Sequence, residues 1–184
     1  MLQLFGRGAS ATTITTLPDG TQVLVESVWP TPRLVVVGDG LLAAAMQDIA
    51  TFLGWDATVV DEAAPAVAAA RTLTPADAIL VLSHDLLIGG PVLQVALSGR
   101  AGYVGALGSR HMQEDRAQWL VEREVPRSLI DLIHGPAGLD VGARTPQEIA
   151  VSITAEVLAV RSGTGGQALR DRPGPVHVDG LRPP

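Results

Sequence analysis

The segment 103–110, YVGALGSR, places glycines, a serine and an arginine directly after a short apolar run. A pattern typical of a helix begins at the same point, in HMQEDRAQWLVERE. Backbone N–H groups at a helix N-terminus attract anions, and glycines let a ligand approach the main chain. The guanidinium of arginine can donate two parallel hydrogen bonds to one phosphate. This pattern predicts an anion site; the alternative is that the serine only caps the helix. The candidate residues are Gly105, Gly108, Ser109 and Arg110.

A second stretch with unusual composition is HGPAGLDVGARTP, residues 134–146. It combines three glycines with His134, Asp140 and Arg144 in one loop, and functional residues often lie on loops held by a rigid scaffold. The alternative is structural: the glycines allow unusual backbone angles, and Asp140 pairs with Arg144. The residues predicted to bind a ligand are Gly138, Asp140, Gly142 and Arg144.

Two further candidate sites follow apolar runs nearer the N-terminus. VVVGDGLLAA carries the G-x-G-x-x-A pattern of a nucleotide-binding turn, and an acidic residue suited to a ribose ends the next apolar run. LSHD ends a third run with a histidine that could bind a ligand. The alternatives are a purely structural turn and, for Asp85, an N-cap. The candidates are Gly38, Gly40, Asp61, Ser83, His84 and Asp85.

The elements that must position these residues alternate along the chain. Apolar strands are predicted at 33–38, 56–61, 77–83 and 102–108, and helices at 41–54, 65–71, 90–99, from 109 onward, and 145–161. The last helix has a capping box, Thr145-Pro146-Gln147-Glu148, whereas 128–135 fits a short helix or a short strand. This alternation predicts an α/β fold with an open, mainly parallel sheet and helices on both faces.

The two ends of the chain have a different composition. Residues 12–28 predict a β-hairpin around the turn Pro18-Asp19-Gly20, and prolines 30 and 32 stiffen the connection that follows. The last residues are rich in glycine and proline without periodicity. We therefore predict an N-terminal hairpin and linker at 1–32, a Rossmann-like domain at 33–162 and a flexible tail at 163–184.

Composition excludes several classes of site. The chain of 184 residues has a net charge of −6, no cysteine, and 13 basic residues that are all arginine. These absences exclude disulfides, cysteine nucleophiles, a P-loop lysine and a Schiff-base lysine, and the acidic balance argues against nucleic-acid binding. Four scattered histidines predict no metal site. Without a signal-like or membrane-length apolar run, a cytoplasmic protein with no membrane span is predicted.

Taken together, the motifs resemble one family. YVGALGSR, then HGPAGLDVGARTPQEIAVSITAEVLAVR, with LVVVGDG and LSHD in order before them, strongly resembles the C-terminal domain of the XdhC/CoxI family, from about 34 to 161. The resemblance implies a Rossmann-like accessory protein, often dimeric, that matures xanthine dehydrogenase, carbon monoxide dehydrogenase and related molybdenum hydroxylases. Such proteins bind the molybdenum cofactor (molybdopterin or its dinucleotide) while a cysteine desulfurase sulfurates it, and help insert it into the apo-hydroxylase.

The function predicted from this resemblance is cofactor binding and delivery, with no catalytic residue assigned. Backbone amides, Arg110 and Arg144 are expected to hold the cofactor phosphate. An NAD(P)-binding oxidoreductase is the alternative favoured by the first turn and Asp61, and a scaffold for a full-length paralogue is a third. Longer family members carry a cysteine motif in an N-terminal domain, so any role of that cysteine in sulfur handling or ligand binding is expected to be absent or to come from another chain.

Overall fold

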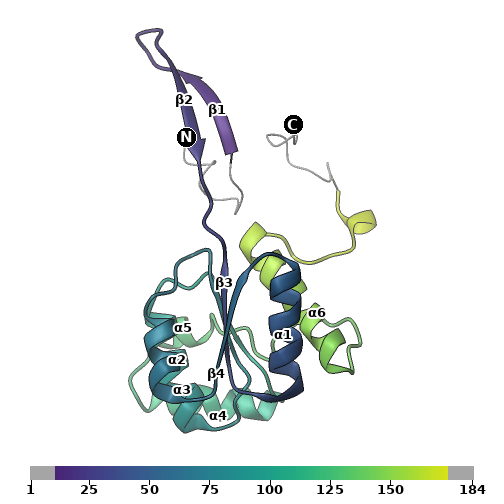
Figure 1. The fold of residues 1–184 in the computed structure, drawn as a ribbon. Helices are drawn as coiled ribbons and strands as arrows, with labels where there is room; N and C mark the ends of the chain where they lie inside the picture. Colours follow the sequence, from purple (N-terminus) through teal and green to yellow (C-terminus); the bar gives the residue numbers. More distant parts are fainter. Residues whose placement is uncertain (1–10, 174–184) are drawn as a thin grey trace.

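The centre of the protein is a parallel sheet of four strands. A computed structural model describes residues 11–173, and in it the strands are ordered β4-β3-β5-β6 (Figure 1). All three pairings are parallel. The four strands confirm the four predicted apolar runs, and they are β3 (Arg33–Val37), β4 (Asp56–Val60), β5 (Ala78–Val81) and β6 (Tyr103–Ala106).

Helices cover both faces of this sheet, as predicted. On one side lie α1 (Gly40–Phe52) and α6 (Pro146–Ser162), and on the other α2 (Ala63–Ala70), α3 (Leu86–Ser98), α4 (Arg110–Val121) and α5 (Arg127–Ile130) (Figure 1). Successive side chains of β3 alternate between the two cores: Leu34 and Val36 pack with α1 and α6, and Val35 with the other helices. A strand buried on both faces explains the unbroken apolar run.

Two segments differ in detail from the sequence-based expectation. Helix α3 begins at Leu86, not near residue 90, because Asp85 caps it and the two following glycines stay helical. A β-carbon on Gly89 would lie 2.8 Å from Val81, so this glycine lets the helix pack closely on β5. The ambiguous segment 128–135 begins as a helix and contains no full strand: α5 ends at residue 130, and His134 then forms a single parallel β-bridge with Gly105 of β6.

The predicted N-terminal hairpin is confirmed by β1 (Ala11–Thr16) and β2 (Gln22–Ser27), which pair antiparallel. The Asp19 carboxylate accepts the Thr21 N–H at 2.9 Å in its turn, and the hairpin projects away from the sheet (Figure 1). At the other end, the described chain closes with a 3-10 turn, η1 (Leu169–Asp171). Residues 1–10 of the predicted hairpin region and 174–184 of the predicted tail lie outside the described range, and the domain boundaries stay predictions.

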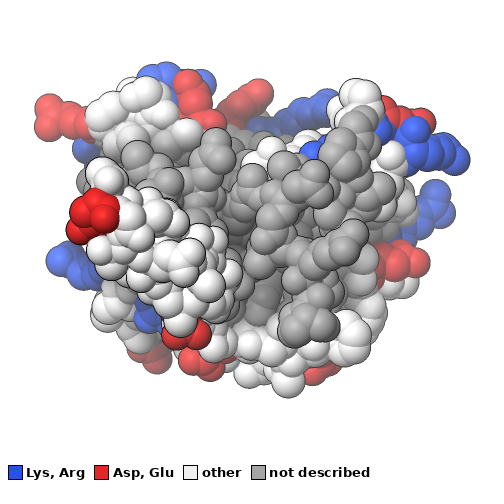
Figure 2. All heavy atoms as spheres, turned by 90° about the horizontal axis from the view of Figure 1, so that it is seen from above, with Lys and Arg blue, Asp and Glu red and all other residues white. Residues whose placement is uncertain are grey.

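Seen from the hairpin end, arginine and acidic side chains of the described residues both lie around the rim of the molecule (Figure 2). Among the described helices, none is long and apolar enough to cross a membrane.

The start of β3 is anchored by a buried ion pair. Asp77 is 3% exposed, and its carboxylate lies 2.8 Å from the Arg33 guanidinium and accepts the N–H and hydroxyl of Thr74. Burial would raise the pKa of Asp77, but the hydrogen bonds from Arg33 and Thr74 outweigh it and hold the pKa below its ordinary value of 3.8. The anchor is therefore complete at neutral pH and weakens only in acid.

We expect Asp77→Asn to lower the free energy of unfolding by about 2–4 kcal/mol at neutral pH, because a half-buried cation loses its partner. A carboxyl group with a lowered pKa stabilises the fold above its ordinary pKa, and this stabilisation is lost as pH falls through the folded value. Urea unfolding at pH 7 and at pH 3 measures both effects. The difference between the two proteins should shrink in acid. Asp48→Asn, at an exposed position of α1, is the control and should change stability by less than about 0.5 kcal/mol.

Candidate functional site

A crevice of ≈ 460 Å³ opens at the carboxyl ends of the strands. The chain leaves β3 for β4 on one side and returns to β5 on the other, so the strand order reverses between β3 and β5. Ligands of open α/β sheets bind at this kind of reversal, and the volume is typical of small-molecule sites. The crevice thus brings together predicted residues from three different loops. It is lined by Gly38, Asp39, Leu42, Asp61, Leu82, Ser83, His84, Ile88 and Leu107.

The first βα turn, residues 38–40 between β3 and α1, has the backbone geometry that its glycines predict. Gly38 has φ +128°, and a β-carbon there would lie 3.0 Å from the Ser83 nitrogen, so the turn is pressed against the end of β5. Gly40 has φ +86° and open space where a β-carbon would stand. The side chain of Asp39, the N-cap of α1, makes no capping hydrogen bond, which leaves N–H groups of the first turn free for a ligand.

The side chains at the crevice are acidic on one side. Asp39 and Asp61 are exposed there, and no arginine is among the lining residues. Asp61 follows β4, where a carboxylate can accept hydrogen bonds from ribose hydroxyls. Asp85 does not line the crevice; its carboxylate accepts the Leu87 N–H at 2.8 Å, which is the capping role given above as the alternative.

A buried arginine beneath the crevice was missed by the sequence analysis. Arg116 of α4 is 3% exposed, and its guanidinium donates to the carbonyls of Ser83 (3.0 Å) and Leu107 (2.5 Å). It also donates to the Gln113 side chain at 3.1 Å. Burial lowers the pKa of Arg116, but arginine keeps its proton at neutral pH. Since Ser83 and Leu107 both line the crevice, this cation ties the ends of β5 and β6 together directly beneath it.

The start of α4 combines a cap with an exposed arginine. The Ser109 hydroxyl accepts the Met112 N–H at 3.3 Å. Gly108 has φ +130°, and a β-carbon there would lie 2.9 Å from the sulfur of Met112. Arg110 is exposed and does not line the crevice. Gly105, within β6, packs against the ring of Tyr103 instead of facing open space.

The late loop is fixed to β6 and α6 through one carboxylate. His134 exchanges backbone hydrogen bonds with β6, and Glu156 of α6 contacts the loop at His134 and Gly138. One Glu156 oxygen accepts the Tyr103 hydroxyl (2.7 Å) and the Gly138 N–H (2.8 Å), and the other lies 3.3 Å from His134 Nδ1. Gly138 has φ +112°, and a β-carbon there would lie 2.6 Å from the Ser152 hydroxyl. Gly138 is therefore required by the loop's packing.

Asp140, Gly142 and Arg144 in the rest of this loop are exposed. Asp140 and Arg144 form no ion pair with each other, so the pairing given above as an alternative is absent from the described part of the chain. Gly142 has φ +73° and open space around it. The predicted capping box is present, and the Glu148 carboxylate also accepts the Arg144 N–H at 2.8 Å. These backbone hydrogen bonds lower the pKa of Glu148.

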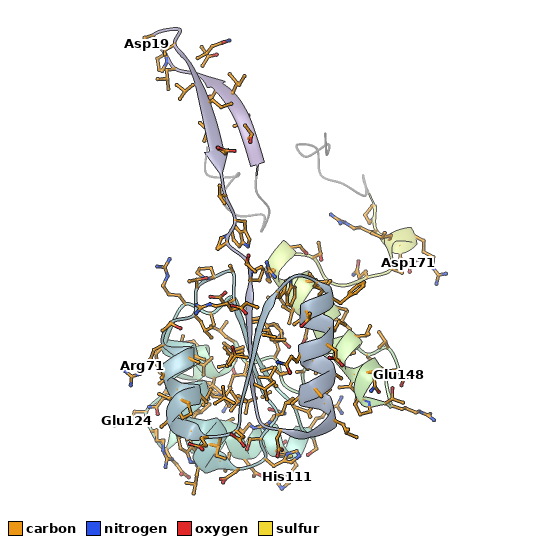
Figure 3. All side chains as sticks on the ribbon, in the orientation of Figure 1. Asp19, Arg71, His111, Glu124, Glu148 and Asp171 are labelled. Atoms are coloured by element: carbon orange, nitrogen blue, oxygen red, sulfur yellow. The ribbon has the colours of Figure 1, made fainter. Side chains whose placement is uncertain are left out.

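The two predicted arginines come from separate parts of the domain. Figure 3 shows His111, next to Arg110 in the chain, at the end of the domain opposite the hairpin, and Glu148, four residues after Arg144, in the first turn of α6.

A second pocket, of ≈ 320 Å³, lies between α4 and α5 and reaches Arg116 and Gly135. No group of three or more metal-ligating side chains occurs within residues 11–173.

Comparison with known proteins adds to this geometry. The family model of the XdhC Rossmann domain matches residues 34–157, which include the crevice, the start of α4 and the late loop. The chain belongs to the XdhC family. The resemblance inferred from the motifs is thereby confirmed.

Two curated relatives of this XdhC domain match it along most of its length. It is 37% identical over 132 residues to the molybdenum cofactor insertion chaperone PaoD of Escherichia coli (strain K12), covering 72% of this chain and 41% of PaoD. It is 27% identical over 161 residues to a probable xanthine dehydrogenase subunit of Bacillus subtilis (strain 168), covering 77% of this chain and 46% of that protein. The chain thus spans less than half the length of these relatives.

A solved structure confirms the fold. The crystal structure of a xanthine dehydrogenase from Bacillus halodurans superposes with a TM-score of 0.61 at 22% identity, covering 82% of this chain and 48% of that one. At this identity the similarity concerns the fold.

Proposed function

We propose that this XdhC domain binds the molybdenum cofactor as cargo and takes part in the maturation of a molybdenum hydroxylase. The observation that carries the proposal is the open crevice at the strand ends, which is lined by Gly38 and Asp39 at the uncapped start of α1. The next residue, Gly40, has open space where a β-carbon would stand. The similarity to a molybdenum cofactor insertion chaperone over 132 residues supports the choice of cargo. The client hydroxylase, a cysteine desulfurase and a second copy of the chain are the proposed partners.

The residues at the crevice fit a cargo of this kind. Free N–H groups at the start of α1 suit a phosphate. The buried positive charge of Arg116 is close to them, because its guanidinium binds the carbonyl of Ser83, which lines the crevice. Asp61 suits the ribose of a dinucleotide form. The cofactor supplies the molybdenum centre used by the hydroxylase, and the task proposed for this chain is to hold and protect it.

An NAD(P)-binding oxidoreductase is the second candidate function. It is favoured by Asp61, which lies at the crevice where a ribose-binding carboxylate is expected. It differs from the first proposal in its ligand, because only the oxidoreductase requires NAD(P) to bind and to exchange hydride. Titration of the full chain with molybdenum cofactor, with NAD⁺ in parallel, separates the two.

We expect Gly40→Ala to weaken binding of molybdenum cofactor at least tenfold, about 1.4 kcal/mol, because the added methyl group occupies the open space beside the α1 N–H groups. At φ +86° an alanine also costs about 1–2 kcal/mol of stability. Isothermal titration at a temperature where both proteins are folded measures the affinity.

Gly54→Ala is the matched control. Gly54 also has positive φ (+70°) and open space, but it lies at the opposite end of α1 from the crevice. It should lose similar stability and keep the affinity of the original protein. Equal affinity in both variants would remove the first turn from the site, and tight NAD⁺ binding without cofactor binding would favour the oxidoreductase.

A further inference from the structure

The contacts of Glu156 fix the hydrogen-bonding state of a histidine. Its Oε2 oxygen already accepts hydrogen bonds from Tyr103 and Gly138. Burial, with the hydrogen bond and charge of Glu156, raises the pKa of Tyr103, so its hydroxyl stays protonated and donates. The carboxylate therefore acts as an acceptor on both oxygens. His134 Nδ1, 3.3 Å from Oε1, is the donor to it.

The imidazole is also held in orientation. Its ring stacks on Tyr103 with centroids 4.8 Å apart and planes 20° from parallel. Its main chain is hydrogen-bonded to β6 on both sides, through Val104 and Ala106. A histidine whose ring position, tautomer and backbone are all fixed loses little freedom when it binds a ligand.

The second ring nitrogen is available. With the proton on Nδ1, neutral imidazole has a lone pair on Nε2, and no partner for Nε2 exists among residues 11–173. This nitrogen is not among the buried polar atoms without partners, and the side chain is 32% exposed, so Nε2 reaches solvent. A carboxylate behind one nitrogen and an open site at the other is the arrangement in which histidine serves as a directed acceptor.

We propose that His134 Nε2 accepts a hydrogen bond from an N–H group of a ligand heterocycle, and that Glu156 is the residue that positions it. The chemical class is a flat heterocycle with N–H donors on its edge, such as a pterin. This inference rests on the proposed function, because it assigns the late loop to the pterin end of the same cargo. Within the loop that follows His134, Gly142 has open space where a β-carbon would stand, whereas Gly135 and Gly138 are packed against neighbouring side chains.

Two substitutions separate the nitrogens of His134. In His134→Asn the amide N–H can replace Nδ1–H and keep the contact with Glu156, but nothing replaces Nε2. In His134→Gln the amide reaches the place of Nε2, where its oxygen can accept. We expect affinity for molybdenum cofactor to fall at least tenfold in His134→Asn and no more than about threefold in His134→Gln.

Glu156→Gln tests the positioning role with a readout that loss of packing alone would not change. The ¹⁵N shifts of His134 in the full chain report which ring nitrogen carries the proton. We expect the Nδ1–H form in the original protein, and a shift toward the Nε2–H form in Glu156→Gln, because an amide can donate to Nδ1. An Nε2–H form in the original protein would overturn the inference.

The outcomes also distinguish this inference from the proposed function. If the original protein and His134→Asn bind the cofactor equally well, the role of His134 is overturned and cofactor binding stands. If the original protein does not bind the cofactor, the proposed function fails. The inference is then decided by titration with pterin (2-amino-4-oxopteridine): a change in the Nε2 shift of His134 supports it, and no change overturns it.

Discussion

Arg116→Met is expected to destabilise the domain and to weaken ligand binding in the crevice together. Methionine matches the length of the arginine stem but leaves the Ser83 and Leu107 carbonyls without their donor. Unpaired buried acceptors cost about 1–3 kcal/mol each, so we expect a loss of about 2–4 kcal/mol in the free energy of unfolding. Urea denaturation measures it.

The effect on binding arises from charge and from geometry. Arg116 joins the loops after β5 and β6, which both line the crevice, and it is a buried positive charge close to a site that otherwise contains Asp39 and Asp61. Its removal leaves the crevice more negative and its wall less rigid. A phosphate-bearing ligand should therefore bind at least tenfold more weakly.

Arg116→Lys separates these two causes. Lysine keeps the charge but cannot make the divergent hydrogen bonds of a guanidinium, so stability should fall nearly as far as in the methionine variant. If the charge attracts the anion, affinity should stay closer to that of the original protein. Unchanged affinity in Arg116→Met would show that the buried cation has only a structural role.

The sheet could be predicted because its signals are local. Each strand of the parallel sheet is a short apolar run that ends near glycine or a polar residue, and α6 begins at a capping box within four consecutive residues. The start of α3 shows where local signals mislead. Gly89, Gly90 and Pro91 suggest a later start, but the cap at Asp85 and the close packing of Gly89 on Val81 keep the earlier turn helical.

The key side chains of the site are determined by contacts between distant residues. Arg116 binds a carbonyl 33 positions away, and Glu156 binds a hydroxyl 53 positions away. Both lie inside helices, and neither is among the site residues predicted from the sequence. One signal existed: Arg116 precedes Leu120 by one helical turn, so a charge occupies the face that packs on the sheet. Glycine motifs in the sequence identify where the chain turns, whereas burial in the structure identifies which charged side chains hold the site together.

Arg110→Ala should weaken cofactor binding at least tenfold without unfolding the protein. Its side chain is exposed just after the Ser109 cap, so the fold does not depend on it. A charged hydrogen bond to phosphate contributes about 1.5–3 kcal/mol, which corresponds to at least a tenfold change in affinity. Arg144→Ala, in the exposed late loop, should have a similar effect. Arg123→Ala is the control and should bind normally, because Arg123 lies just after the C-terminal end of α4 and its guanidinium stacks on Trp119.

The double variant Arg110→Ala/Arg144→Ala then shows whether the two arginines share one phosphate. Residues that hold the same group give coupled losses, and independent contacts give losses that add. Since α4 begins at the end of the domain and the late loop lies beside α6 (Figure 3), we expect addition, close to a hundredfold loss. Addition would mean that one cargo presents two anionic groups to two loops. A smaller loss in the double variant would instead support a single phosphate between them, which requires the late loop to move toward α4 when the ligand binds.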